Sequence, residues 1–470
     1  MLFNSIEYVI FLVIVLSLYW ITDTNYRLIL LLSVSNFFYY TFQPQYIYLI
    51  YLIALIDFIL AYLITSYRSF ASYLLFINII INLFILFFFK YYNFYFEIIS
   101  SFLNEYPKNG SYIELILPLG ISFYTFQSIS YIVDVYKGKF PAQKKFLPYL
   151  CYIFFFPILI AGPLVRASQL IPQFSRKLRF SYINLSIGVK YILFGLFLKV
   201  VLADNLGTIV DELFLMQPKN FSATDVLTMS FLFGFQIYFD FSSYSLIAIG
   251  SALLFGIHLP KNFNFPYSAT SPRDFWRRWN ITLSKWIVDY IYIPLLNSSN
   301  SNKLKLAPYS VLCLFLTWLV MGLWHGASYN FILWGAYHAM FILIYRFVTF
   351  FKLNLNIKFK EILGLGLTLP IIMLSWIFFR SPDLNYSITM FSKLIEFDNF
   401  FSISFKESYY LIATLILLSY YALFLWCKHR IYKYIPLIIY KILNLIFYTI
   451  IIFFIFTYLE TKNQFIYFQF

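Results

Sequence analysis

Long apolar stretches, several of them close to the width of a bilayer, restrict what this chain can fold into. Tyr8–Ile21, Leu28–Tyr40, Tyr46–Thr65 and Tyr73–Phe89 approach or reach the roughly 20 residues that a helix needs to cross the hydrocarbon core. Lipid does not tolerate the open edges of a sheet, because no water satisfies the backbone there. The sequence therefore predicts an all-α, polytopic integral membrane protein.

The composition supports the same class. Of the 470 residues, 61% are hydrophobic and only 11% are charged, which no soluble globular class matches. The net charge of +14 lies mainly in short loops between apolar runs, and no basic tail or soluble domain is apparent, so we expect no nucleic-acid partner. Met1–Ile21 lacks a basic leader and a small-residue cleavage site, and we expect it to be a retained first span.

The apolar segments can be placed along the chain by their hydropathy. The expected spans cover about 6–21, 26–42, 46–65, 72–89, 112–134, 149–165, 182–202, 226–255, 308–324, 329–349, 362–380, 409–427 and 434–458. Pro157 interrupts segment 149–165, and we expect this segment and 280–296 to be re-entrant. About eleven segments then cross the bilayer, within one domain that covers residues 1–470.

Basic residues mark the loops that we expect on the cytoplasmic side. They are Lys137, Lys139, Lys144 and Lys145; Arg176, Lys177 and Arg179; Arg273, Arg277, Arg278 and Lys285; Lys352, Lys358 and Lys360; and Lys428, Arg430 and Lys433. The loops 90–111, 203–225 and 381–408 mix acidic residues with few basic ones. We therefore expect these three loops, and both termini, on the outside.

The polar stretch that begins at Ser271 carries most of the residues capable of chemistry. Ser271 and Asp274 have the S-x-x-D spacing of a helix start, and Pro272 occupies the first helical position, where a missing N–H costs nothing. Asp274 is placed to pair with Arg277 and Arg278 one turn later.

Aromatic and aliphatic residues then recur at helical spacing. The predicted stripe consists of Trp276, Trp279, Leu283, Trp286, Tyr290 and Ile293. An indole stripe beside a cationic face is typical of a helix that lies in the membrane interface. The arginines are either interfacial anchors only, or they also bind an anionic group such as a phosphate-bearing carrier.

Three of the ionisable residues within the apolar runs are candidates for function. His325 lies between Trp324 and Gly326, and an ionisable residue at membrane depth is usually functional. His338, 13 residues later, would lie on nearly the opposite face of one unbroken helix, and we interpret it as structural or supporting. Asp240 needs a partner, and it either holds an arginine or tyrosine or shapes an acceptor site.

Short motifs spread along the chain form an ordered set. They are FFKYYN at 88–93, GISFYTFQ at 120–127, AGPLVR at 161–166, DFSSYS at 240–245, LPKNFN at 259–264, the stretch from Ser271 to His338, and FIYFQF at 465–470. Together they resemble the membrane-bound O-acyltransferase (MBOAT) family. Within this family, the motifs most resemble those of the bacterial enzymes that O-acetylate alginate or peptidoglycan, and the D-alanine transferase of teichoic acids is a more distant relative.

The resemblance implies a helical ring around a transmembrane tunnel in the bacterial inner (cytoplasmic) membrane, with the acyl donor entering from the cytoplasm and the acceptor from the other side. It places the family's central histidine at His325 and its second polar position at Asn280, where the bacterial polysaccharide branch usually has His. The chain also departs from the family's D-F-S-G-Y-S-D pattern at Ser243 and Leu246. A periplasmic SGNH-type acetyltransferase partner fits the same resemblance.

Acyl transfer from a thioester to a hydroxyl requires a base for the hydroxyl proton and a donor for the developing oxyanion. His325 can serve as the base, and Asn280 can donate its amide N–H. The candidate substrate-binding residues are Arg277, Arg278, Trp279, Trp324 and Asp240. We expect no bound cofactor and no metal, with acetyl-CoA or another acyl thioester as the donor. The alternative is a polytopic transporter or a lipid-linked glycan flippase, which buried polar residues would also suit.

Overall fold

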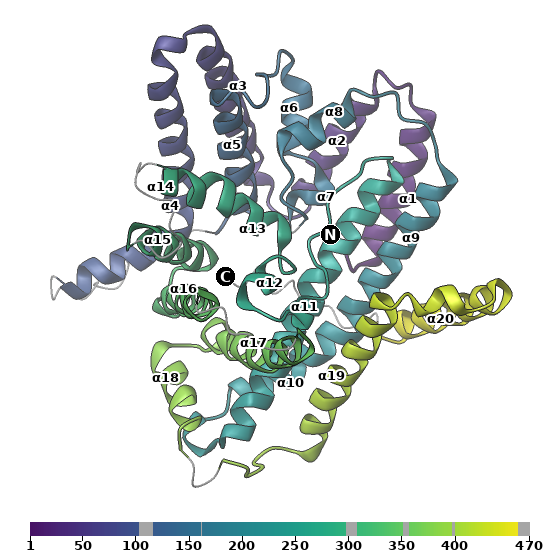
Figure 1. Ribbon diagram of the computed structural model, residues 1–470. Helices are drawn as coiled ribbons and strands as arrows, with labels where there is room; N and C mark the ends of the chain where they lie inside the picture. The colour runs from purple at the N-terminus through teal and green to yellow at the C-terminus, as the bar shows by residue number, and fades with distance from the viewer. Residues whose placement is uncertain (103–115, 161, 298–307, 351–356, 397–399, 459–470) are drawn as a thin grey trace. The chain divides into compact units, whose positions relative to one another are not determined.

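The computed structural model (Figure 1) describes residues 1–102, 116–160, 162–297, 308–350, 357–396 and 400–458. All regular secondary structure in these ranges is helical, which confirms the predicted all-α class. The closing motif at 465–470, Ala161 of the AGPLVR motif, Lys352 and part of the expected outside loop 90–111 lie outside the described residues.

The chain divides into two compact units, and helices α9 and α11 contribute residues to both. The N-terminal unit comprises Met1–Ile192 and Tyr244–Lys261, and the C-terminal unit comprises Leu193–Ser243 and Asn262–Phe470. The single domain over 1–470, and the helical ring with its tunnel, stay predictions.

The helices of the N-terminal unit follow the chain order. They are α1 (Ile6–Ile21), α2 (Arg27–Tyr40), α3 (Ile47–Ser66), α4 (Ala71–Phe102), α5 (Ile121–Tyr136), α6 (Phe146–Ile153), α7 (Phe156–Leu159), α8 (Ala167–Phe174), most of α9 (Tyr182–Leu196) and the end of α11 (Ala223–Leu254), with short 3-10 turns at Pro44–Tyr46 and Arg68–Phe70.

The C-terminal unit holds the remaining helices. They are the π-helical turn η3 (Phe197–Ala203), α10 (Asp204–Phe214), the start of α11, α12 (Pro272–Trp276), α13 (Ile281–Ile287), the π-helical turn η6 (Val288–Tyr292), α14 (Ile293–Asn297), α15 (Pro308–His325), α16 (Tyr329–Phe350), α17 (Ile357–Arg380), α18 (Leu384–Lys393), α19 (Glu407–Lys428) and α20 (Leu437–Tyr458), with 3-10 turns at Pro218–Asn220, Pro266–Ser268 and Ile431–Tyr434.

Nine helical segments among the described residues are long and apolar enough to cross a membrane. Two shorter apolar helices, Ile6–Ile21 and Arg27–Tyr40, coincide with the first two expected spans. The chain is therefore a multi-pass membrane protein, and the number of crossings stays a prediction.

The structure corrects the ends of several expected segments. Helix α4 continues to Phe102 instead of ending at 89, because aromatic rings one turn apart pack along it, as with Phe88 and Tyr92 at 6.1 Å. Residues 203–225, expected as a loop, contain α10, which follows α9 through a π-helical turn. The expected loop 381–408 contains α18, which begins where the Asp383 carboxylate accepts the N–H of Tyr386 at 2.8 Å.

Segment 149–165 does not form one spanning helix. It breaks into α6 and α7, separated at Phe154 and Phe155, and the chain then runs without helix to Arg166 apart from the undescribed Ala161. The break agrees with the interruption that Pro157 predicts, and a re-entrant path for this segment stays a prediction.

Two glycines bring α15 and α16 into backbone contact in the C-terminal unit. A Cβ atom on Gly322 would overlap the carbonyl oxygen of Phe331, and a Cβ atom on Gly335 would overlap the carbonyl oxygen of Trp318. Figure 1 shows the two helices side by side. This close crossing fixes the end of α15, where His325 lies.

The last two of the three loops expected outside are joined by hydrogen bonds. Thr224 Oγ1 donates to the carbonyl oxygen of Phe400 at 2.8 Å, and Ser222 Oγ donates to that of Ser402 at 2.7 Å. Nearby, the Tyr409 hydroxyl raises the pKa of the exposed Lys406. The contacts agree with a location of both loops on one side of the membrane.

Candidate active site

His325 ends α15 among aromatic rings. Its imidazole centroid lies 4.8 Å from the ring centroids of Trp324 and Trp334 and 5.0 Å from that of Phe379, and all three contacts are edge-on. The residue is only 4% exposed. The histidine that the sequence singles out therefore lies in a buried and largely apolar setting, where an electrostatic interaction is stronger than in water.

His338 lies on the neighbouring helix α16 and shares Trp334 with His325. The Trp334 ring centroid is 4.7 Å from that of His338. Trp276 Nε1 donates to His338 Nδ1 at 3.4 Å, so the proton of a neutral His338 lies on Nε2. The comparison of the two histidines on one unbroken helix does not apply, because α15 ends at His325 and α16 begins at Tyr329.

The stretch that begins at Ser271 folds as predicted at its start. The Ser271 hydroxyl accepts the N–H of Asp274 at 3.1 Å, and Pro272 occupies the first turn of α12. The helix then ends at Trp276, and α13 begins only at Ile281.

The single helical stripe expected along 276–293 is therefore wrong. The four large residues Trp276, Trp279, Leu283 and Trp286 are buried inside the C-terminal unit. Trp276, for example, packs 4.8 Å from the ring of Trp318. The large rings bury more apolar area against the neighbouring helices than one straight interfacial helix would allow.

Asn280 occupies the break between α12 and α13. Its backbone is left-handed, with φ 38° and ψ 56°, a conformation that Asn tolerates better than most residues. Its carbonyl oxygen accepts the N–H of Ser284 at 2.9 Å and so begins α13. Asn280 is 3% exposed. The left-handed backbone therefore favours an asparagine at position 280, independently of the chemical role predicted for its side-chain amide.

Asn262, which the sequence analysis did not single out, holds this break in place. Its backbone carbonyl accepts the N–H of Ile281 at 2.9 Å, and its side-chain Oδ1 accepts both the N–H and the hydroxyl of Thr282, at 3.2 Å and 2.7 Å. The available signal was the LPKNFN motif, which contributes this asparagine. We interpret Asn262 as a residue that positions Asn280.

A chain of ring contacts connects the stretch to His325. The Trp279 ring centroid lies 4.9 Å from that of Trp376, which lies 5.5 Å from that of Phe379, a direct neighbour of His325. Trp279 is 1% exposed and Trp324 is also buried. Both predicted binding residues are therefore part of the aromatic interior of the C-terminal unit.

The two predicted arginines differ in their surroundings. Arg278 Nε donates to Asp274 Oδ2 at 2.9 Å, as the i,i+4 spacing predicts, and its guanidinium also reaches the carbonyl of Asn264 at 3.4 Å. Arg277 caps α12 and is exposed. Arg277 is therefore the better placed of the two to bind an anion from solution.

Asp240 forms an ion pair that the sequence did not predict. The Lys199 ammonium lies 2.8 Å from a carboxylate oxygen of Asp240 and 2.8 Å from one of Asp204, and all three side chains are almost fully buried. Lys199 belongs to the π-helical turn η3, and such turns are frequent at functional sites. The signal was available, because Lys199 is an ionisable residue within the expected apolar span 182–202, which also contains Lys190.

Among the residues that the structure describes, no three His, Cys, Asp or Glu side chains lie close enough together to bind one metal ion.

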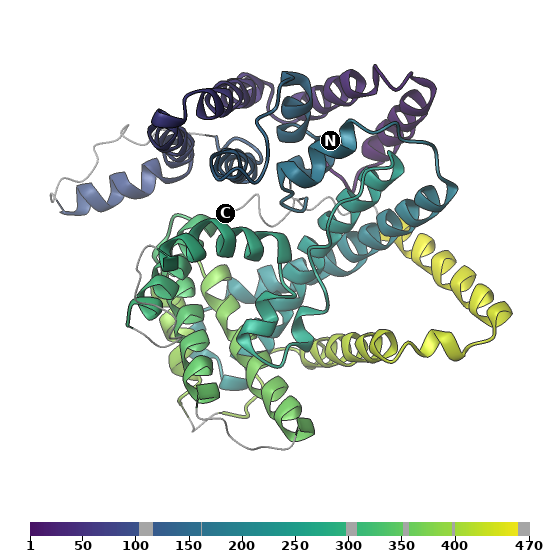
Figure 2. The same cartoon turned by 45° about the horizontal axis from the view of Figure 1, so that its top comes forward.

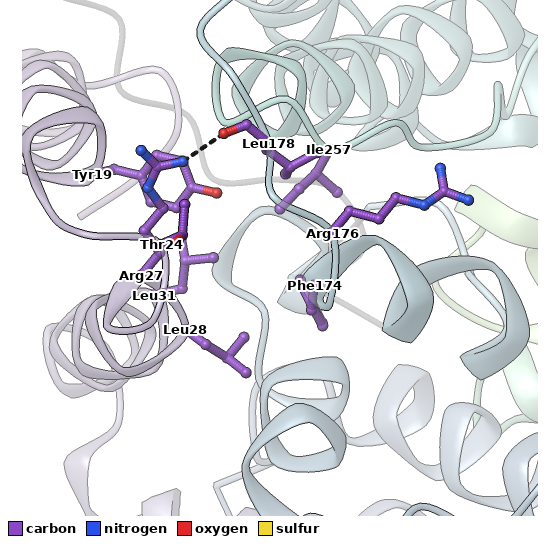
Figure 3. A pocket seen from close by; sticks show the side chains of 9 residues that line it. All are labelled: Tyr19, Thr24, Arg27, Leu28, Leu31, Phe174, Arg176, Leu178 and Ile257. Atoms are coloured by element: carbon purple, nitrogen blue, oxygen red, sulfur yellow. Dashed lines mark hydrogen bonds between the residues drawn. The ribbon is translucent and has the colours of Figure 1, made fainter.

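A pocket lies in the N-terminal unit and is lined by Tyr19, Thr24, Arg27, Leu28, Leu31, Phe174, Arg176, Leu178 and Ile257 (Figure 3). Arg27 Nη1 donates to the carbonyl of Leu178 at 2.8 Å beside it. None of the predicted site residues lines this pocket.

The chain is similar to several known proteins. Over 283 residues it is 38% identical to the "Probable alginate O-acetylase AlgI" of Pseudomonas syringae pv. tomato, a match that covers 60% of this chain and 52% of the relative. Over 310 residues it is 37% identical to the peptidoglycan O-acetyltransferase of Helicobacter pylori, covering 60% and 58%. The teichoic acid D-alanyltransferase of Bacillus subtilis is 30% identical over 241 residues, covering 50% and 60%.

These matches span little more than half the length of each relative. The model of the family "MBOAT, membrane-bound O-acyltransferase family" matches residues 143–381, just over half of the 470 residues. This range contains His325, Asn280 and the Lys199 ion pairs. The chain therefore belongs to the membrane-bound O-acyltransferase family.

Proposed function

We propose that this protein is an O-acyltransferase that moves an acyl group, most simply acetyl, from a cytoplasmic thioester such as acetyl-CoA to a hydroxyl of a cell-envelope polysaccharide or to a periplasmic partner. The observation that carries the proposal is the buried imidazole of His325, enclosed by Trp324, Trp334 and Phe379 within the range that matches the family.

His325 acts as the general base. The acceptor hydroxyl gives its proton to an imidazole nitrogen while its oxygen attacks the thioester carbonyl. The C–S bond then breaks, and the imidazolium returns the proton to the leaving thiolate, so that ester and thiol are the products. The neutral form of a histidine side chain is the one that accepts a proton, and histidine ordinarily titrates near physiological pH.

Asn280 and Arg277 supply two further roles in this proposal. The amide N–H of Asn280 donates to the oxyanion that develops on the thioester carbonyl, and its left-handed backbone, held by Asn262, fixes where that amide points. The exposed guanidinium of Arg277 binds the phosphates of the donor. Arg278 contributes less, since Asp274 neutralises part of its charge.

The relatives support the acceptor class that we propose, since their names refer to alginate, peptidoglycan and teichoic acid. All three are polymers found outside the cytoplasm, which supports a location in the inner (cytoplasmic) membrane. Transfer through an SGNH-type periplasmic partner is the route we propose where the acceptor polymer does not itself reach the membrane.

Purified protein in liposomes, supplied with radiolabelled acetyl-CoA on one side and envelope polysaccharide on the other, tests the proposal. Acetyl ester should form with the wild-type chain and not with His325→Gln. The buried charges at Lys199, Asp204 and Asp240 also suit a transporter, the alternative reading. Movement of lipid-linked glycan across the same liposomes without ester formation would favour that alternative and contradict the acyltransferase.

A further inference from the structure

A carboxylate lies at the middle of a membrane helix in the N-terminal unit. Asp57 is the single acidic residue of α3, lies near the middle of that helix and is completely buried. Helices α4, α5 and α6 pack against α3 (Figures 1 and 2). Ionisable residues at this depth are rare and usually mark an ion or proton site.

Three neutral side chains donate to the Asp57 carboxyl group. Asn78 Nδ2 and Asn82 Nδ2 donate to Oδ1 at 2.6 Å and 3.2 Å, and the Tyr149 hydroxyl donates to Oδ2 at 3.0 Å. Three donated bonds suit a carboxylate. Burial opposes that charge unless a cation lies beside it, and no Lys, Arg or His forms an ion pair with Asp57 among the residues that the structure describes.

The same helices present oxygen atoms that have no hydrogen-bond partner within the described ranges. They are Asn82 Oδ1, Thr125 Oγ1 and Ser128 Oγ, and each belongs to a side chain that is at most 1% exposed. Ser128 interacts with Asp57, although its hydroxyl does not meet the geometry of a hydrogen bond. Thr125 lies one turn before Ser128, on the same face of α5.

We propose that Asp57 and these oxygens bind a desolvated monovalent cation, with Na⁺ as the ion of matching chemistry. Hard cations prefer carboxylate, amide and hydroxyl oxygens, which are the atoms present here. A single carboxylate balances one positive charge, whereas a divalent ion would leave a buried charge of +1. A proton on Asp57 would satisfy at most one of these oxygens, of which Ser128 Oγ already interacts with Asp57, whereas a metal ion can coordinate several.

The site would stabilise the packing of α3, α4 and α5, and it does not depend on the reaction proposed above. Purified full-length protein in choline chloride is titrated with NaCl at constant ionic strength, while Tm and the binding of radioactive sodium are measured. We expect saturable binding and a Tm that rises by about 1.5 °C once Na⁺ exceeds its Kd tenfold.

Asp57→Asn should abolish both the binding and the Tm rise, and Ser128→Ala should weaken the affinity about tenfold. Asp23→Asn, an exposed carboxylate in the loop after α1, is the matched control and should change neither. If Asp57→Asn does not fold, the sodium titrations of the wild type and of Ser128→Ala decide the matter. Equal Tm in sodium, potassium and choline without sodium binding overturns the proposal, as does a Tm that responds to protons alone.

Discussion

Replacement of His325 by glutamine tests the proposed base with the least structural disturbance. General-base catalysis typically contributes about 10²–10⁴-fold, so loss of the base should cost roughly 3–5 kcal/mol of barrier. Alanine is a poorer choice. His325 is packed against three rings, and truncation of a large buried side chain leaves a cavity that costs about 2–5 kcal/mol of folding free energy.

Glutamine fills most of the same volume and keeps a hydrogen-bonding group, so His325→Gln should fold while losing at least about a hundredfold in acetyl transfer. The rate is measured in liposomes with labelled acetyl-CoA, and Tm is measured on the same preparation. His338→Gln is the matched control, because His338 is an equally buried imidazole that also packs against Trp334.

His338→Gln should lower Tm by as much as His325→Gln but reduce the rate less than tenfold. A folded His325→Gln variant that keeps most of the activity would refute general-base catalysis by this residue. Equal losses of rate in the two variants would show that the aromatic cluster as a whole is needed, and not a base at His325.

Three further perturbations follow from the structure. Lys199→Met leaves two buried carboxylates without their cation and should lower the free energy of unfolding by about 3–5 kcal/mol, measured by thermal unfolding. An unchanged Tm would show that water already screens these carboxylates. Gly335→Ala places a methyl group against the backbone of the neighbouring helix and should clearly lower Tm. The control Gly366→Ala has open space around the new methyl group and should be neutral or slightly stabilising. Similar Tm changes in both variants would contradict the close helix crossing. Arg277→Glu should raise the KM for the acyl thioester about tenfold or more, with little change in the KM for the acceptor. The control is Arg273→Glu, which changes an exposed arginine one turn earlier. An equal effect of this control would show that Arg277 acts only through the general charge of the surface.

The sequence determined the long apolar helices of this protein because their signals are local. Helices that pass through lipid must satisfy their own backbone, so the length of an apolar run is enough to predict α3 or α16. The helix cap at Ser271 could be predicted for the same reason, because it depends on neighbouring residues in the chain. His325 could be singled out because it is an ionisable residue between apolar runs. The i,i+4 ion pair of Arg278 with Asp274 belongs to this group as well.

Contacts between distant segments were decided by the tertiary structure alone. The spacing of Trp276, Trp279 and Leu283 fits one helix, but burial of those rings against other helices outweighs the few hydrogen bonds lost at the break. Lys199 lies 41 residues from Asp240, and helical periodicity cannot relate the two. The same holds for Asp57 and Tyr149, because a buried charge selects its partner through the packing of whole helices and not through spacing along the chain.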